Sequence, residues 1–191
     1  RTRAVFEDRG VTGIFRVRDL KLLAVREGHE ETTRTRIVEG GHHLWTDPST
    51  VYYSSRLSHE REGTLNCAMN LRQELGRPLS ICDPYAGVGP SLRPLIAEPE
   101  LVGELFAGDL NPAAAEFLRE NIIHPTATIE CIDALALENR LEMCENYDLL
   151  LINIPHDSLQ HLPNILPLLR PNGIARGWAI IEDSDFESSM V

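Results

Sequence analysis

Apolar and polar residues largely alternate along the first part of the chain. The alternation covers residues 14–25 and resumes at residues 32–38, and a period of two residues is typical of strands with one buried face. Polar residues around Gly28 predict a turn between these segments, and the pair Gly40–Gly41 ends the second one. Further short extended segments are expected at 44–47 and 51–54. We therefore predict a small β-rich unit over residues 1–57.

The pattern becomes helical after residue 57. Apolar side chains recur at helical spacing, at Leu65, Ala68, Met69, Leu71 and Leu75. Gly76 follows the last of them, and glycine readily adopts the left-handed conformation that ends helices. The sequence therefore predicts a helix over residues 58–76.

From residue 79 onwards, short apolar segments alternate with segments that favour helices. Strands are expected at 79–83, 102–109, 127–132, 147–152 and 173–181, and helices at 91–97, 112–122 and 158–169. Pro112 suits the first turn of its helix, where its missing N–H donor is not needed. This alternation predicts a parallel sheet with right-handed crossovers, a Rossmann-like α/β fold, over residues 58–191. Such sheets bind ligands beyond the carboxyl ends of their strands.

A glycine-containing loop, residues 83–90, follows the first strand of the predicted sheet. Gly87 and Gly89 would let the backbone turn tightly and approach a ligand closely. Asp109, one strand–helix unit later, suits a carboxylate that accepts hydrogen bonds from ribose hydroxyls. The spacing is not the Gly-x-Gly-x-x-Gly of dinucleotide sites, and no lysine follows as in a P-loop. The loop therefore favours a nucleoside without a pyrophosphate, such as S-adenosylmethionine, although a purely structural turn explains the glycines equally well.

Polar side chains stand at the ends of four successive predicted strands. Asp83 and Asp109 end the first two, Asp133 follows the third, and Asn153 follows the fourth. Each of them alone could be a helix cap or a turn residue. Together they favour a ligand cleft, because the carboxyl ends of parallel strands meet at one edge of a sheet.

Composition places the chain among soluble globular proteins. It has 191 residues, of which 42% are hydrophobic and 25% charged, and no apolar run approaches the length of a membrane span. Nothing at the start resembles a signal peptide. The cysteines share no Cys-x-x-Cys spacing, so we expect reduced thiols, a cytoplasmic location, no membrane contact and no metal site.

The net charge of −11 argues against a generally basic nucleic-acid binder. Arginines nevertheless gather in the first third of the chain, so a local basic patch stays compatible with the sequence.

Five segments resemble, in order, those of class I methyltransferases that use S-adenosylmethionine. They are residues 16–19, 52–61, 83–90, 109–112 and 153–156. The Arg-Leu-x-x-Glu-Arg element at 56–61, combined with Asn-x-Pro-His at 153–156, is the more specific part of the match. The chain is similar to the archaeal and eukaryotic family of tRNA guanine-N1-methyltransferases that act at position 37. It also resembles their relative, the aminocarboxypropyl transferase of the wybutosine pathway.

The resemblance implies roles for individual residues. It implies a tRNA substrate and an S-adenosylmethionine site that includes Tyr52, Arg56, Asp83, Tyr85, Asp109, Asp133 and Pro155 together with the loop glycines Gly87 and Gly89. It further implies Glu60 as the general base, Arg18 as the group that stabilises charge on the target base, and Asn153 as the group that orients guanine.

Elementary chemistry is consistent with these roles. N1 of guanine carries a proton at neutral pH, so a base such as Glu60 must remove it as the methyl group arrives. The negative charge that then develops on O6 suits a guanidinium such as that of Arg18. Simpler interpretations exist, because Glu60–Arg61 could be surface charge at a helix start, Arg18 a solvated strand residue, and Tyr52–Tyr53 packing residues.

The chain departs from this family at both ends. It starts too late to include the family's tRNA-gripping domain, and it ends after the fifth predicted strand in the acidic segment 182–189. We therefore expect either a fragment or a short homologue that needs the missing domain or a partner protein to bind tRNA. Transfer of the aminocarboxypropyl group and a non-catalytic module with this fold remain alternative functions.

Overall fold

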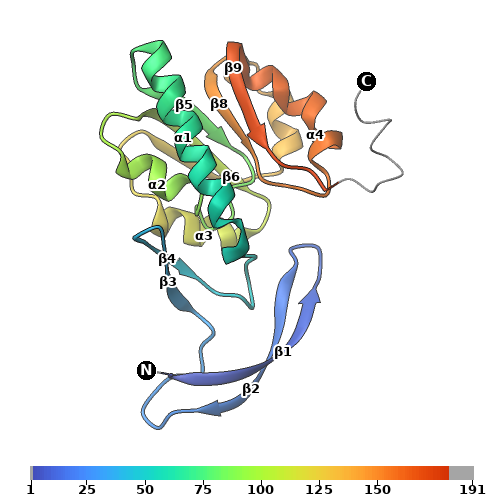
Figure 1. Ribbon diagram of the computed structural model, residues 1–191. Helices are drawn as coiled ribbons and strands as arrows, with labels where there is room; N and C mark the ends of the chain where they lie inside the picture. Colours follow the sequence, from blue (N-terminus) through green and yellow to red (C-terminus); the bar gives the residue numbers. More distant parts are fainter. Residues whose placement is uncertain (1, 181–191) are drawn as a thin grey trace.

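Five parallel strands form the main sheet of the computed structural model, which describes residues 2–180 (Figure 1). They are β5 (Leu79–Asp83), β6 (Val102–Asp109), β7 (Ala127–Cys131), β8 (Tyr147–Ile152) and β9 (Leu169–Gly177). Their order is β7-β6-β5-β8-β9, so the direction in which strands are added reverses between β5 and β8. Such a reversal opens a crevice at the carboxyl ends of the two strands, where parallel sheets bind ligands.

Helices pack on both faces of this sheet (Figure 1). The α-helices are α1 (Ser58–Leu75), α2 (Leu92–Ala97), α3 (Pro112–Asn121) and α4 (Ser158–Ile165), and the 3-10 helices are η1 (Ser55–Leu57), η2 (Ala134–Asn139), η3 (Leu141–Met143) and η4 (Leu166–Leu168). Ile81 and Leu149 belong to one hydrophobic cluster with α1, α2 and α3. Their neighbours Cys82 and Leu150 belong to a second cluster with η2 and α4. Successive strand residues point to opposite faces, so β5 and β8 are buried on both.

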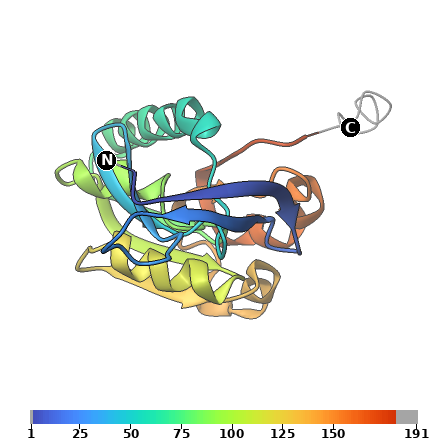
Figure 2. The same ribbon diagram turned by 90° about the horizontal axis from the view of Figure 1, so that it is seen from below.

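The first strands of the chain form two antiparallel hairpins. β1 (Ala4–Thr12) pairs with β2 (Val17–Val25), and β3 (Thr35–Glu39) pairs with β4 (His42–Thr46). Asn121 of α3 holds β4, because its side chain accepts a hydrogen bond from the Trp45 N–H at 2.7 Å and donates one to the Trp45 carbonyl at 2.8 Å. Seen from below, the β1–β2 hairpin runs across the sheet domain, and its tip lies on the side of α4 (Figure 2).

The parallel α/β fold predicted from the sequence is confirmed, with close bounds for β5, β6, β7, β8 and the helices. Gly76 ends α1 as expected, with φ of 66°. The pattern misses β1, because Glu7, Asp8 and Arg9 interrupt its alternation and the strand is bulged at two points. The turn at 28–30 joins two strands that pair with other partners.

One further prediction of an extended segment is wrong, and one predicted strand starts earlier than expected. Residues 51–54 are irregular, with Val51 buried in a small cluster against Val88 and Ala114. β9 begins at Leu169, ahead of the predicted residue 173. Pro171 and Asn172 are typical of loops, which is why the prediction starts after them, but an irregular register between β8 and β9 accommodates both residues within the strand. It ends at Gly177, and residue 181, its predicted end, lies outside the described residues.

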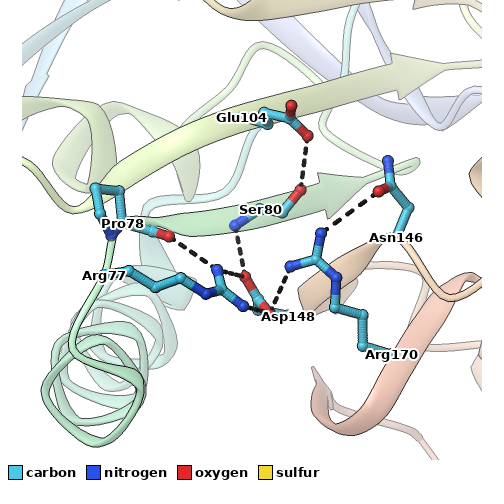
Figure 3. A network of polar contacts seen from close by, with 7 residues as sticks. All are labelled: Arg77, Pro78, Ser80, Glu104, Asn146, Asp148 and Arg170. Atoms are coloured by element: carbon cyan, nitrogen blue, oxygen red, sulfur yellow. Dashed lines mark hydrogen bonds and ion pairs between the residues drawn. The ribbon is translucent and has the colours of Figure 1, made fainter.

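An ion-pair network around the buried Asp148 lies at the amino ends of the central strands (Figure 3). Asp148 of β8 accepts hydrogen bonds from Arg77 at 2.8 Å, from Arg170 at 2.9 Å and from the Ser80 backbone N–H at 2.9 Å. Burial alone would raise the pKa of Asp148, but these hydrogen bonds outweigh it and lower the pKa to about 2. The network joins β5 and β8 at the end opposite to their polar carboxyl ends.

Across residues 2–180, none of the helices combines the length and the apolar character that crossing a membrane requires.

Candidate functional site

A cleft of about 230 Å³ opens at the carboxyl ends of the central strands. Its polar lining includes Asp109, Asn111, Asp133, Asn153 and His161, and its apolar lining includes Leu110, Ala114, Ile132, Ala134 and Ile154. A small hollow of about 60 Å³ is lined by four of the same residues, Tyr52, Tyr85, Gly87 and Asn153. A larger hollow of about 540 Å³, between the β3–β4 hairpin and the start of α1, is lined by none of the predicted strand-end residues. The cleft, which is lined by the polar strand-end residues, is therefore the candidate ligand-binding site.

Asp83 lies beneath the cleft and is fully buried. Its Oδ1 accepts a hydrogen bond from the Tyr85 backbone N–H at 3.2 Å, and its Oδ2 accepts one from Asn153 Nδ2 at 3.0 Å. Burial raises the pKa of Asp83 to about 8; the negative charge of Asp109 adds to the rise, and the two hydrogen bonds oppose it. Asp83 is therefore largely protonated at neutral pH.

Asp109 ties the glycine loop to the end of β6. Its Oδ2 accepts a hydrogen bond from the Gly87 N–H and its Oδ1 one from the Asn111 N–H, both at 2.8 Å. Gly87 has φ of 56°, a conformation that glycine adopts at little cost. Burial raises the pKa of Asp109 above its ordinary value, and both backbone hydrogen bonds oppose the rise. Each oxygen keeps a lone pair that can accept from a ligand hydroxyl.

Asp133 and Tyr85 contribute a second wall. Asp133 lines the cleft and caps η2, because its Oδ1 accepts a hydrogen bond from the Leu135 N–H at 3.0 Å. The Tyr85 hydroxyl lies 2.9 Å from Nδ1 of His161 on α4. The sequence pattern contains no signal for His161, which is separated from Tyr85 by 76 residues.

A buried network supports the segment that carries Tyr52. Nη1 of Arg61 donates to both Glu39 oxygens, at 2.7 and 2.6 Å, and Nη2 donates to the Ser54 carbonyl at 3.0 Å. The Tyr53 hydroxyl donates to the same Glu39 carboxylate. Arg61 is only 6% exposed, so its interpretation as surface charge is wrong.

The cleft brings together Tyr52, Tyr85, Gly87, Asp109, Asp133 and Asn153 from the predicted set, with Asp83 directly beneath. Hairpin-tip residues Ile14 and Phe15 also line it, although no motif in the sequence marks them as site residues.

Five other predicted site residues do not line the cleft or the hollow beside it: Arg18, Arg56, Glu60, Gly89 and Pro155.

Glu60 and Arg18 each pair with another side chain. The Glu60 carboxylate is 3.6 Å from Nη2 of Arg176, and its side chain is 47% exposed. Arg18 lies 3.4 Å from Asp8 across the β1–β2 hairpin. Their predicted catalytic roles stay predictions.

The remaining three have backbone or surface positions. Arg56 is exposed in η1. The Pro155 carbonyl accepts a hydrogen bond from the Ile180 N–H at 2.8 Å. Gly89 has φ of 84°, and a Cβ there would meet Ile122 and Leu118 at less than 3 Å, so this glycine is needed for packing against α3.

The charged residues that line the cleft are acidic. Within residues 2–180, no arginine or lysine lines it, whereas Asp109 and Asp133 do. The same part of the chain holds no cluster of three or more His, Cys, Asp or Glu that could bind a metal ion. Such a lining suits a ligand that carries hydroxyl or amino donors and a positive charge.

Comparison with known proteins gives a consistent family assignment. The model of the TRM5/TYW2 methyltransferase domain matches residues 35–189. The tRNA (guanine(37)-N(1))-methyltransferase Trm5b of Methanocaldococcus jannaschii is 29% identical over 175 residues, which cover 92% of this chain and 47% of the relative.

Solved structures agree. The complex of aTrm5 and tRNALeu matches with a TM-score of 0.71 and 26% identity, over 91% of this chain and 47% of that one. M. jannaschii TYW2 in complex with AdoMet shares the fold, with a TM-score of 0.65 and 21% identity, over 82% of this chain and 65% of that one. The chain thus spans about half the length of the first two of these relatives.

Proposed function

The chain belongs to the family of the TRM5/TYW2 methyltransferase domain, and from this premise we propose that it binds S-adenosylmethionine and methylates N1 of guanosine 37 in tRNA. The observation that carries the proposal is the cleft lined by Asp109, beneath which Asn153 bonds to the buried Asp83.

The cleft residues fit this cofactor. Asp109 offers acceptors for ribose hydroxyls, and the acidic lining suits the positive charges of a sulfonium and an ammonium group. The apolar side chains of Leu110, Ile132 and Ala134 can cover the faces of a flat adenine ring. When bound, S-adenosylmethionine supplies an electrophilic methyl group.

The residues of the chain would supply proton transfer and orientation. Glu60 takes the N1 proton of guanine, Arg18 stabilises the negative charge on O6, and Asn153 orients the base. Asn153 uses Nδ2 to bond to Asp83, which leaves its Oδ1 free to accept from the guanine edge. The Glu60 side chain must leave Arg176 before it can act as the base.

Transfer of the aminocarboxypropyl group is the second candidate, because the matching family includes TYW2 as well as TRM5. Both reactions would use the same cleft and differ in which carbon bonded to the sulfonium is transferred. A non-catalytic module that only binds the cofactor is the third.

The test is a tRNA modification assay followed by identification of the modified nucleoside. Transcripts with G37, and control transcripts with A37, are incubated with S-adenosylmethionine labelled in its methyl group. We expect 1-methylguanosine from the G37 transcript alone. A parallel reaction with tRNA that carries the modified guanosine tests the second candidate, which mass analysis identifies by the larger aminocarboxypropyl group. Cofactor binding without any modification supports the third.

The proposal includes three further expectations, on domain organisation, cellular location and tRNA binding. We divide the chain into a β-rich unit, residues 1–57, and a cofactor-binding domain, residues 58–191. We place the protein in the cytoplasm. We also propose that tight tRNA binding requires further protein surface, because the net charge of −11 opposes contact with phosphates.

A further inference from the structure

Tyr85 and His161 form a hydrogen-bonded pair in the wall of the cleft. Tyr85 Oη and His161 Nδ1 are 2.9 Å apart, and the ring centroids are 5.8 Å apart at an interplanar angle of 49°. Tyr85 comes from the loop after β5 and His161 from α4, so the pair joins two elements that both contribute to the lining.

The hydroxyl of Tyr85 is positioned to donate to Nδ1 of His161. Burial raises the pKa of Tyr85, and the negative charge of Asp133 raises it further, so the phenol keeps its proton. A phenol that donates to Nδ1 leaves the imidazole proton on Nε2. With the bond in this direction, the pair fixes one tautomer of His161, with an N–H donor at Nε2.

The cleft has few side-chain donors of this kind. Besides His161 they are the Tyr52 and Tyr85 hydroxyls and the amides of Asn111 and Asn153, each of which already donates one N–H, to the Thr50 carbonyl at 2.8 Å and to Asp83 respectively. Asp109 and Asp133 are acceptors when ionised. An adenosine ligand presents ring nitrogens and ribose oxygens that accept hydrogen bonds, and these need a donor from the protein.

We propose that His161 is a ligand-binding residue of this cleft, and that its Nε2–H donates to an acceptor atom of the bound nucleoside. The inference rests on the proposed function in taking S-adenosylmethionine as the ligand. Tyr85 acts through His161, as the positioning residue that sets the tautomer and the orientation of the ring.

Two substitutions separate this role from a purely structural one. In His161→Asn the amide lies near the position of Nδ1, so it keeps a partner for Tyr85 and loses the donor at Nε2. In His161→Gln the longer side chain places its amide near Nε2, so it keeps the ligand donor and loses the bond to Tyr85. A structural tether would tolerate asparagine, and a ligand contact would tolerate glutamine.

Calorimetric titration with S-adenosylmethionine and with S-adenosylhomocysteine tests the inference. We expect His161→Asn to raise both dissociation constants about five- to tenfold, the effect of losing one hydrogen bond, and His161→Gln to stay within about twofold of the wild type. Thermal unfolding of each variant confirms that it is folded. Wild-type affinity in His161→Asn, or an equal loss in His161→Gln, would overturn the inference alone. Failure of the wild type to bind either compound would overturn the proposed function, and the inference with it.

A second measurement does not depend on any variant. Long-range proton–nitrogen spectra of the 15N-labelled wild type report which imidazole nitrogen carries the proton. We expect His161 to be protonated at Nε2 alone at pH 8. A proton on Nδ1 would overturn the inference.

Discussion

Asn153 donates a hydrogen bond from Nδ2 to Oδ2 of the fully buried Asp83 at 3.0 Å, and so joins the carboxyl ends of β8 and β5. These are the strands between which the order of the sheet reverses. The bond is made by a carboxyl whose pKa is raised to about 8, so its protonation state affects both stability and ligand binding.

Replacing Asp83 with asparagine is expected to change how stability depends on pH. The folded protein keeps the Asp83 proton up to about pH 8, whereas the ordinary pKa of the group is 3.8. Unfolding therefore releases a proton between these values, and stability falls as the pH rises through this window. Asp83→Asn removes this slope and should be more stable than the wild type at pH 8, by as much as a few kcal/mol, at about 1.4 kcal/mol for each pH unit of difference. Urea unfolding at pH 5, 7 and 8.5 measures the effect.

The exposed Asp19 provides the control for this series. Asp19→Asn should leave the slope of stability against pH as it is in the wild type. An unchanged slope in Asp83→Asn would show that Asp83 ionises normally in the folded protein.

Binding of the cofactor is expected to release a proton from the same group. At pH 7 most Asp83 side chains are protonated, and a positively charged ligand in the cleft favours the ionised form. Titration of the protein with S-adenosylmethionine in two buffers of different ionisation enthalpy gives the number of protons released. We expect up to one proton at pH 7, and close to none in Asp83→Asn. Proton uptake at pH 7 in the wild type would contradict this account.

Asp109→Ala is expected to weaken cofactor binding by about ten- to a hundredfold, because charge-assisted hydrogen bonds contribute about 1.5–3 kcal/mol. The substitution removes the proposed ribose acceptor and also the partner of the Gly87 and Asn111 N–H groups. Glu116→Ala, an exposed position on α3, is the matched control and should bind normally. Equal affinity in both variants would remove Asp109 from the cofactor site.

The sequence predicts the parts of this site that follow from strand ends. Asp109, Asp133 and Asn153 could be placed together because each ends or follows a strand of one parallel sheet. His161 could not, because which face of α4 meets the glycine loop depends on tertiary packing. The burial of Arg61 could not be predicted from the sequence either, since its partner Glu39 precedes it by 22 residues on a separate hairpin. A charged residue near the start of a helix is usually exposed to solvent, whereas here the β3–β4 hairpin covers Arg61.

Asp148→Asn is expected to destabilise the protein by about 1.5–3 kcal/mol at pH 7, because it replaces the charge-assisted hydrogen bonds to two partly exposed arginines with neutral ones (Figure 3). The wild-type pKa is lowered to about 2, so the stabilisation is present above the ordinary value of 3.8 and is lost as the pH falls towards 2. The difference between variant and wild type in urea unfolding should therefore shrink from pH 5 to pH 2. A constant difference would mean that the carboxylate contributes through its shape alone.

Glu60→Gln is expected to slow methyl transfer about 100-fold or more, the usual contribution of a general base, while cofactor affinity stays unchanged. Glutamine keeps the size of the side chain and can still contact Arg176, so the packing of α1 against β9 is preserved. Glu62→Gln is the control, because Glu62 is exposed on the same helix turn. Single-turnover rates with the G37 transcript and calorimetric binding of S-adenosylmethionine separate the two effects. Wild-type turnover in Glu60→Gln would assign the base to another residue. Weakened cofactor binding would instead place Glu60 in the cofactor site.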